Sequence, residues 1–321
     1  MQKILDKVNR IFDREQFIHE PKGLYEPIEY TLRLGGKRIR PVMLLAANQM
    51  FGGDMEQAQY AAVGIELFHN FTLLHDDLMD KSPIRRGKPT VYCKWNENTA
   101  ILSGDTMYAL AWQYFLRQPH PNLQEILNCF NKTSIEVCEG QQYDMDFEQQ
   151  EDITIADYLM MIRLKTAVLL AGALKIGALY ADANPEDIQH LYEFGIHLGL
   201  AFQLQDDLLD SYGDVTVLGK QTCQDIRDNK KTYLLLKALE LVSPEQKREL
   251  IQLFSTTPAE DGPKVDRVLE IYAQSGVRQH VDRTIEEEFG LAQKHLKSIR
   301  VEDVQKQPLE ELTTMLLHRK K

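Results

Sequence analysis

Apolar side chains recur at every third or fourth position along most of this 321-residue chain. Alternating runs of β-branched residues bounded by turn residues are nearly absent, so helices are predicted almost throughout. We expect helices over 1–33 with an interruption near Pro21–Gly23, then over 42–50, 62–80, 100–115, 123–141, 155–179, 187–209 and 232–241. Beyond Pro244 the helices are expected to break at Pro258, Gly262, Gly276 and Gly290. The pattern predicts an all-α fold.

Two acidic clusters of the same pattern lie about 130 positions apart, each at the end of an apolar helical run. They comprise Asp76, Asp77 and Asp80, and Asp206, Asp207 and Asp210. A carboxylate at a helix C-terminus typically costs up to about 1 kcal/mol, because that end carries a partial negative charge. Mg²⁺ resolves this conflict, since it binds few carboxylates and bridges them to substrate phosphates. The two clusters are predicted to be two halves of one metal site.

The two halves must then converge, which argues for one domain. Length alone would suggest about two domains, but no Gly/Ser-rich or Pro-rich linker divides the chain. We expect a single large helical domain over residues 1–321.

Basic side chains gather close to the acidic clusters in sequence. Arg85, Arg86 and Lys88 surround Gly87 just after the first cluster, and guanidinium groups bind phosphate oxygens bidentately. Further cations are Lys37, Arg38 and Arg40 in a glycine-containing turn, Lys165 within an apolar helix, and Lys220, Lys230 and Lys231 after the second cluster. They predict anion sites beside the metal site.

The overall charge excludes several function classes. A net charge of −11 argues against nucleic acid or a membrane surface as a general partner, because both are polyanions. The four cysteines lack metal-ligand spacing, and no apolar run reaches the roughly 18 residues of a membrane span. Charges interrupt the amino-terminal stretch where a signal peptide would be apolar. A cytoplasmic protein without stable membrane insertion is expected.

Taken in order, these motifs resemble the trans-type polyprenyl diphosphate synthases, which join isopentenyl diphosphate to an allylic diphosphate head to tail. The resemblance spans most of the chain. It rests on Gly35–Pro41, Asp76–Asp80 with Arg85–Gly87, Lys165–Thr166, Phe202–Gln203, Asp206–Asp210 and Gly219–Lys220. Each motif alone is weak, whereas six in the family's order are specific. The resemblance implies an isoprenoid-synthase-type helical bundle around a central active-site cavity, and a homodimer.

The resemblance also implies residue roles. About three Mg²⁺ ions per site would be held by Asp76, Asp80 and Asp206, supported by Asp77, Asp207 and Asp210. The allylic diphosphate would meet Arg85, Lys165 and Lys220, with Lys230 and Arg38 as further substrate-binding candidates, and isopentenyl diphosphate would meet Lys37, Arg40, His69 and Arg86. Thr166 and Gln203 would steady the allylic carbocation by their dipoles. No protein nucleophile is required.

Product length is expected to depend on the helical turns before Asp76. At a rise of about 1.5 Å per residue, Phe71 and Phe68 lie about 7.5 and 12 Å from Asp76 along the helix. In the family these positions line the tunnel for the growing tail, and Thr72 beside them is small. The pattern resembles the short-chain farnesyl and geranylgeranyl synthases, the archaeal ones above all. An all-trans product of fifteen to twenty carbons (C15–C20) is predicted.

Other interpretations of the same residues remain open. A single acidic cluster could be a solvated helix end, His69 could be a core histidine, and Lys165 could extend to water. Arg319 is either part of a frayed tail or a further contact to isopentenyl diphosphate. For the whole chain the alternatives are a terpene cyclase and a non-catalytic regulatory subunit of a heteromeric synthase. Intact Asp206–Asp210, Lys37 and Arg40 argue against both.

Overall fold

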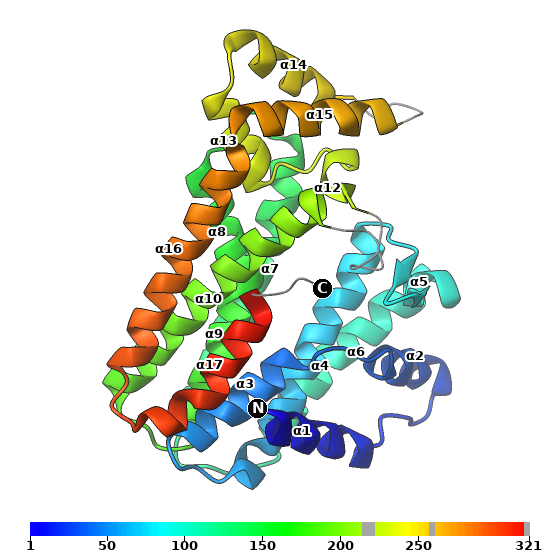
Figure 1. The fold of residues 1–321 in the computed structure, drawn as a ribbon. Helices are drawn as coiled ribbons and strands as arrows, with labels where there is room; N and C mark the ends of the chain where they lie inside the picture. The colour runs from blue at the N-terminus through cyan, green and yellow to red at the C-terminus, as the bar shows by residue number, and fades with distance from the viewer. Residues whose placement is uncertain (214–221, 257–260, 318–321) are drawn as a thin grey trace. The chain divides into compact units, whose positions relative to one another are not determined.

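The computed structural model describes residues 1–213, 222–256 and 261–317, nearly all of them in helices (Figure 1). The first helices are α1 (Gln2–Arg14), α2 (Lys22–Arg33), α3 (Ile39–Met50), α4 (Met55–Met79), α5 (Val91–Lys94), α6 (Glu97–Phe115), α7 (Leu123–Gln149), α8 (Ile155–Ile162) and α9 (Val168–Leu179). A π-helical turn, η1 (Arg163–Ala167), joins α8 to α9. The later helices are α10 (Pro185–Tyr212), α12 (Gln224–Arg227), α13 (Tyr233–Leu241), α14 (Pro244–Phe254), α15 (Gly262–Ser275), α16 (Val277–Ser298) and α17 (Asp303–Leu317).

The all-α class predicted from the hydrophobic pattern is confirmed. Within the described residues, the strands are two short ones, β1 (Ile84–Arg85) and β2 (Lys88–Pro89), which form an antiparallel hairpin. Over the same residues, no helix combines the length and the apolar character needed to cross a membrane. The four cysteines, all within the described residues, form no disulfide.

The chain forms two compact units, each assembled from separate stretches of sequence. The first unit comprises residues 1–130, 173–188 and 301–309. The second unit comprises the described residues of 131–172, 189–300 and 310–321. Neither unit is a contiguous sequence domain, and the single domain over 1–321 stays a prediction.

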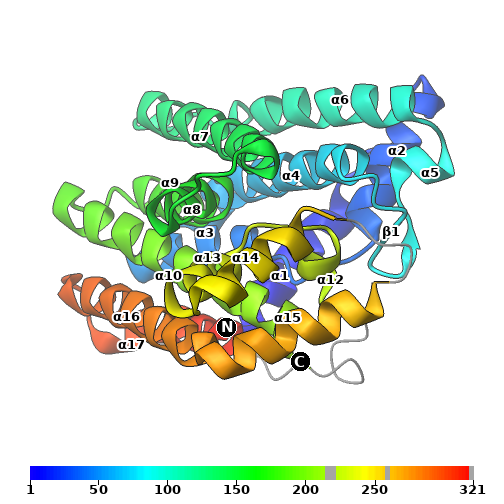
Figure 2. The ribbon, with the colours of Figure 1, turned by 90° about the horizontal axis from the view of Figure 1, so that it is seen from above.

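In the first unit, α4 is a buried helix that carries the first acidic cluster at its C-terminal end. It packs against α3 and α6, and α4 and α6 lie side by side (Figures 1 and 2). Gly64 permits this close packing, because a Cβ there would lie 2.9 Å from the ring of Phe115 on α6. The core of this unit therefore fixes the helix whose last turn bears Asp76.

In the second unit, α10 carries the other acidic cluster. Gly195 and Gly199 on α10 face the segment that begins at η1, since Cβ atoms there would lie 2.6 and 2.5 Å from the Cα atoms of Ala171 and Ala167. Helices without side chains at the contact approach each other closely, which brings the backbone of η1 next to α10. This contact places Thr166 within hydrogen-bonding distance of Gln203.

Some predicted boundaries were wrong. No break occurs at Gly290, which lies inside α16 in open space, with no neighbouring atom within 4 Å of a Cβ built there. A mid-helix glycine costs about 1 kcal/mol, and buried Val281, Ile285 and Leu296 on the same helix offset it. By contrast, the interruption expected near Pro21–Gly23 is present, over residues 15–21, and α2 begins at Lys22. The helix expected over 155–179 contains the π-helical turn η1.

Candidate active site

The first acidic cluster occupies the last turn of α4, where its three carboxylates differ in environment. Asp77 is buried, Asp76 is half-buried and Asp80 is exposed. Arg85 binds Asp77 closely: its Nε lies 2.8 Å from both carboxylate oxygens and its Nη2 lies 2.7 Å from Oδ1. Burial raises the pKa of Asp77, and the hydrogen bonds and charge of Arg85 oppose that rise. Asp77 is therefore held by protein, while Asp76 and Asp80 end the helix one turn apart.

Arg85 and Arg86 are presented by the β1–β2 hairpin. Its two turn residues, Arg86 and Gly87, both have positive φ, 52° and 73°, as a type I′ turn requires. The Arg86 guanidinium packs directly on Gly36, whose Cβ would lie 2.8 Å from Nη2. The two basic segments that the sequence separates by some fifty positions thus meet in the first unit.

His69 and Arg40 form a half-buried pair beside this contact. His69 Nε2 accepts a hydrogen bond from Arg40 Nη1 at 3.0 Å, because a guanidinium can only donate. Burial and the charges of Arg40, Arg86 and Arg85 hold the pKa of His69 well below its ordinary value. Burial, aided by the Arg86 charge, lowers the pKa of Arg40 to about 10, against an opposing attraction from Glu66. The imidazole is neutral and the guanidinium is charged.

Two buried donors in this region lack acceptors. Among the described residues, Arg40 Nε and Arg38 Nη1 have no hydrogen-bond partner. Arg38 also stacks over the Phe12 ring at 3.7 Å and donates to the carbonyl of Leu32 at 3.3 Å. Unsatisfied buried donors are costly, and an anion such as a diphosphate oxygen would satisfy the one on Arg40. Lys37 in the same turn is exposed.

The predicted tunnel-floor residues belong to an aromatic group on α4 and α6. Phe71 stacks on Tyr108 with ring centroids 5.4 Å apart, and Phe68 contacts Phe71, Tyr108 and Phe130 at 5.5 to 5.6 Å. Phe68 is fully buried and Phe71 is half-buried. Thr72 donates a hydrogen bond to the His69 carbonyl at 2.8 Å. Tyr108 was not predicted, although it is the ring that joins the two phenylalanines.

The second acidic cluster lies in the last two turns of α10, where Asp207 and Asp210 accept hydrogen bonds from neighbouring groups. Asp207 accepts hydrogen bonds from Tyr158 and from Gln203 Nε2, the latter at 3.0 Å. Burial, with the nearby charge of Asp225, raises the pKa of Asp207 to about 7. Asp210 caps α12 by accepting from the Asp225 amide at 3.0 Å. Asp206 is half-buried.

The catalytic candidates Lys165 and Thr166 lie in the π-helical turn η1. Such turns are frequent at functional sites, because they interrupt the regular hydrogen-bond ladder. Thr166 Oγ1 donates to Gln203 Oε1 at 3.0 Å, and Lys165 Nζ lies 2.6 Å from Asp144 Oδ2. Lys230 Nζ lies 3.9 Å from the same Asp144 oxygen. Thr166, Gln203 and Asp207 therefore form one hydrogen-bonded chain, with the two lysines near a shared acid.

Comparison with known proteins identifies the architecture. The sequence model described as polyprenyl synthetase matches residues 21–272. The chain belongs to the polyprenyl synthetase family. It is 40% identical over 261 residues to the geranylgeranyl diphosphate synthase of Sulfolobus acidocaldarius, covering 80% of this chain and 79% of that protein. It is 39% identical over 249 residues to the geranylfarnesyl diphosphate synthase of Natronomonas pharaonis, covering 72% and 73%.

The crystal structure of the geranylgeranyl pyrophosphate synthetase from Pyrococcus horikoshii Ot3 matches 99% of the chain. The match covers 98% of that structure, with a TM-score of 0.91 and 33% identity. The predicted family, a family of prenyltransferases, is thereby confirmed. The individual site residues of this polyprenyl synthetase chain stay predictions.

The donor chemistry of the two clusters fits the Mg²⁺ predicted for this polyprenyl synthetase. All six candidate ligands are carboxylates, the oxygen donors that Mg²⁺ prefers. Within the part of the chain that the structure describes, no three His, Cys, Asp or Glu side chains converge as a closed all-protein metal cage would require. Mg²⁺ sites typically use one or two carboxylates together with waters and phosphates.

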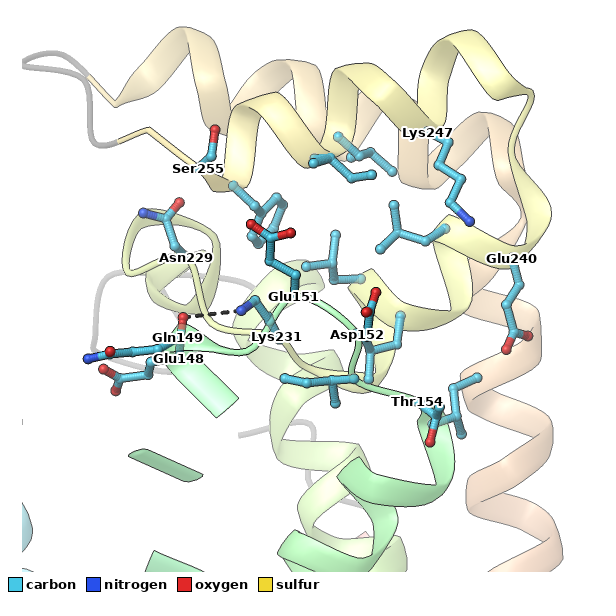
Figure 3. Close-up of a pocket in the computed structure, with 18 residues that line it drawn as sticks. Glu148, Gln149, Glu151, Asp152, Thr154, Asn229, Lys231, Glu240, Lys247 and Ser255 are labelled. Atoms are coloured by element: carbon cyan, nitrogen blue, oxygen red, sulfur yellow. Dashed lines mark hydrogen bonds between the residues drawn. The ribbon is translucent and has the colours of Figure 1, made fainter. Parts of the chain in front are cut away.

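A pocket of about 610 Å³ lies apart from these residues, in the second unit (Figure 3). Leu235, Leu236 and Leu239 of α13 line it together with Leu250 and Phe254 of α14 and the segment 148–155. Of the described residues around this pocket, Lys231 is one of the basic positions from which anion sites were predicted, and none of the others was predicted to belong to the site. Lys220 and Arg319, which were predicted, lie outside the described residues.

Sequence reasoning about this polyprenyl synthetase missed Asp144, Tyr158 and Tyr108. Asp144 belongs to the acidic stretch Asp144–Asp152, where nothing in the sequence distinguishes it from its solvated neighbours. Tyr158 has its partner, Asp207, 49 positions away. Of these three residues, Tyr108 alone had a usable sequence signal, because it lies on the apolar face of α6 with Met107 and Ala111.

Proposed function

We propose that this chain transfers prenyl groups by condensing isopentenyl diphosphate head to tail with an allylic diphosphate, dimethylallyl, geranyl or farnesyl. The products are an all-trans prenyl diphosphate of fifteen to twenty carbons and pyrophosphate. The proposal rests on one observation. In each unit one helix carries aspartates at its C-terminal end, and cationic side chains lie in the same unit. In the first unit these are Arg40, Arg85 and Arg86, and in the second Lys165 and Lys230.

Mg²⁺, about three ions per site, belongs to this proposal. Asp76, Asp80 and Asp206 would hold the metal directly. Asp77 binds Arg85, Asp207 binds Tyr158, and Asp210 binds the Asp225 amide. These three carboxylates would support the metal-binding ones. When bound, Mg²⁺ supplies positive charge that stabilises the departing pyrophosphate.

The cationic side chains divide between two diphosphates. Lys165, Lys220 and Lys230 bind the allylic diphosphate, whose charge they help to stabilise as its C–O bond ionises. Arg40 and Arg86 bind isopentenyl diphosphate with Lys37, and neutral His69 orients the Arg40 guanidinium by accepting its Nη1 proton. Arg85 contributes by binding the Asp77 carboxylate, and Arg38 contributes by stacking on the Phe12 ring. This division refines the sequence-based roles without adding a nucleophile.

Thr166 and Gln203 offer oxygen lone pairs to the allylic cation. The Thr166 hydroxyl proton is directed to Gln203, and the Gln203 amide group is directed to Asp207. The Thr166 hydroxyl proton is used inside the protein, so its oxygen keeps lone pairs, and the Gln203 carbonyl oxygen keeps a second lone pair beyond the one that Thr166 uses. Oriented dipoles of this kind stabilise a cation without trapping it covalently. The proton lost after carbon–carbon bond formation passes to a pyrophosphate oxygen.

The aromatic group Phe68, Phe71 and Tyr108 limits product length. These rings fill the space beside α4 one and two turns before Asp76, where the growing tail would extend. Thr72, the small neighbour of Phe71, adds no second ring there. The relative named geranylgeranyl diphosphate synthase favours the C20 end of this range, whereas the one named geranylfarnesyl diphosphate synthase corresponds to a C25 product outside it.

A cytoplasmic homodimer is the assembly that we propose. Ile101 and Leu102, at adjacent positions on α6 in the first unit, are 45% and 60% exposed in the isolated chain. Large apolar side chains that are exposed together support an interface. Four cysteines without a disulfide agree with a reducing compartment.

The test is a product assay. Purified protein is incubated with Mg²⁺, radiolabelled isopentenyl diphosphate and, separately, each of the three allylic diphosphates, and the dephosphorylated alcohols are sized. Label in a C15 or C20 alcohol supports the proposal. Failure to incorporate label with every allylic partner would reject it, and cyclic hydrocarbon from the allylic substrate alone would indicate a terpene cyclase.

A further inference from the structure

Asp144 on α7 lies between two of the lysines assigned to the allylic diphosphate. Its Oδ2 atom is 2.6 Å from Lys165 Nζ and 3.9 Å from Lys230 Nζ. Only 16% of the Asp144 side chain is exposed, compared with 23% for Lys165 and 41% for Lys230. One largely buried carboxylate oxygen therefore faces two ammonium groups that come from segments 65 positions apart in sequence.

The first of these contacts is built on close backbone packing. Gly140 lies one turn before Asp144 on the same face of α7. A Cβ at Gly140 would lie 2.2 Å from the backbone nitrogen of Lys165, so α7 touches η1 at this point. The Asp144–Lys165 ion pair is consequently fixed by two rigid elements, not by two free side chains.

The second contact is supported by the neighbouring lysine. Lys231 Nζ donates to three carbonyl oxygens at the C-terminal end of α7, those of Phe147 at 2.9 Å, Glu148 at 3.1 Å and Gln150 at 2.6 Å. Figure 3 shows the bond to Glu148. Carbonyls at a helix end lack helical partners and favour a cation. Lys231 thus ties its segment to α7, which keeps the adjacent Lys230 near Asp144.

The charges in this trio leave a positive surplus. Burial alone would raise the pKa of the Asp144 carboxyl, but the charges of Lys230 and Lys165 and the hydrogen bond from Lys165 outweigh it, and the pKa lies below its ordinary value. One negative and two positive groups sum to +1 within the trio, and the Asp207 carboxyl also lies within electrostatic range of Lys230. Without the carboxylate, two ammonium groups of this kind would repel each other and swing apart.

We propose that Asp144 is a positioning residue for the allylic diphosphate, which holds Lys165 and Lys230 as a fixed pair before the substrate binds. This rests on the proposed function of those two lysines. Long lysine side chains lose conformational freedom when they bind an anion, and a pair already held in place loses less. Asp144 acts through the lysines and does not touch the reacting atoms. Asp144 is therefore expected to affect the binding of the allylic diphosphate and not that of isopentenyl diphosphate.

The test compares Asp144→Asn with two further variants. Asparagine keeps the shape of the side chain and removes its charge, whereas Asp144→Glu keeps the charge. Asp146→Asn is the matched control, because Asp146 is an exposed acid on the same helix whose side chain accepts a hydrogen bond from Gln142 at 2.7 Å. KM values for geranyl diphosphate and isopentenyl diphosphate are measured separately, together with calorimetric binding of inorganic pyrophosphate with Mg²⁺.

Asp144→Asn is expected to raise KM for the allylic substrate and to weaken pyrophosphate binding roughly tenfold. KM for isopentenyl diphosphate should change by less than about twofold, since Arg40 and Arg86 are not altered. Asp144→Glu should recover part of the loss, and Asp146→Asn should match the wild type. Equal increases in both KM values, or unchanged pyrophosphate binding, would overturn the proposal, because a merely structural acid affects both substrates alike.

Lys165→Met, measured in parallel, separates this inference from the function on which it rests. If Lys165→Met weakens pyrophosphate binding and Asp144→Asn does not, the lysine assignment is correct and the inference about Asp144 is wrong. If neither variant weakens it, the role proposed for Lys165 is also wrong. Because pyrophosphate binding does not depend on turnover, the outcome is decided even for a variant that is inactive.

Discussion

At the scale of single residues, His69 shows how the protein maintains a neutral imidazole among cations. Burial and three arginines lower its pKa, and the lone pair on Nε2 accepts from Arg40. A protonated imidazole could not accept this bond. The protonation state of His69 therefore determines how the Arg40 guanidinium is oriented. The free energy needed to keep the His69 imidazole neutral should be measurable.

His69 makes the folded state less stable in mild acid. The pKa is about 6.5 in the unfolded chain and lower in the folded one, so below pH 6.5 the unfolded state binds the extra proton. Stability then falls by up to about 1.4 kcal/mol per pH unit from this group as the pH drops towards the folded pKa. We expect His69→Gln to lose less stability than the wild type between pH 7 and pH 5, measured by urea unfolding.

His19→Gln is the control for this experiment, because His19 is exposed. It should follow the wild-type pH dependence. If His69→Gln and the wild type lose stability in parallel, His69 is not kept neutral by folding.

Phe71 is the residue expected to control product length. Its ring stacks on Tyr108 and contacts Phe68, so Phe71→Ala opens space in the direction in which the tail would grow. We expect products longer by at least one isoprene unit, with a loss of about 1–3 kcal/mol in the free energy of unfolding, since the ring is half-buried. Chromatography of the dephosphorylated alcohols measures the first effect and urea unfolding the second.

Phe115→Leu controls for general loosening of the same aromatic group. Phe115 lies on α6 and stacks on Phe130 with ring centroids 4.3 Å apart. It is not part of the predicted floor on α4. It should destabilise the protein without changing product length. An unaltered product from Phe71→Ala would place the floor elsewhere.

At the scale of secondary structure elements, the contact between α7 and η1 positions the catalytic candidates. Gly140→Ala would place a Cβ 2.2 Å from the Lys165 nitrogen, and backbone atoms cannot move aside as a flexible side chain can. Overpacking of this kind costs about 1–3 kcal/mol. A displacement of Lys165 and Thr166 by a fraction of an ångström should also lower kcat by roughly tenfold to a hundredfold. Urea unfolding and steady-state kinetics measure the two effects.

Gly290→Ala is the matched glycine-to-alanine control. Gly290 lies in the interior of α16 with open space around it, so alanine should raise the free energy of unfolding by about 0.5–1 kcal/mol and leave kcat unchanged. If Gly140→Ala were equally harmless, η1 would have room to move, and its contact with α7 would not position Lys165.

At the scale of the whole molecule, the sequence predicted what is local and missed what depends on contacts between distant segments. The helices, the two acidic clusters and the basic turn at Gly35–Pro41 are encoded in short stretches of chain. The pairing of Tyr158 with Asp207 joins residues 49 positions apart, and the π-helical turn η1 depends on glycines of α7 and α10 that pack against it. Hydrophobic periodicity carries no information about either, because both are consequences of packing.

The largest-scale prediction concerns the two acidic clusters, which belong to different units. If they hold one set of Mg²⁺ ions on one diphosphate, inorganic pyrophosphate with Mg²⁺ should stabilise the chain by about 2.7 kcal/mol at a hundred times its Kd. Either Asp76→Asn or Asp206→Asn should then remove most of the rise in Tm, because each variant breaks the same site. Removal of Mg²⁺ with a chelator should have the same effect on the wild type.

Two independent sites would behave differently in the same thermal unfolding experiment. Each single variant would then abolish only the contribution of its own cluster, and the two losses would add in the double variant. Convergence predicts the opposite, that the double variant loses no more than either single one. Asp105→Asn is the control, since Asp105 is an exposed acid on α6 outside both clusters. Its pyrophosphate-induced rise in Tm should equal that of the wild type.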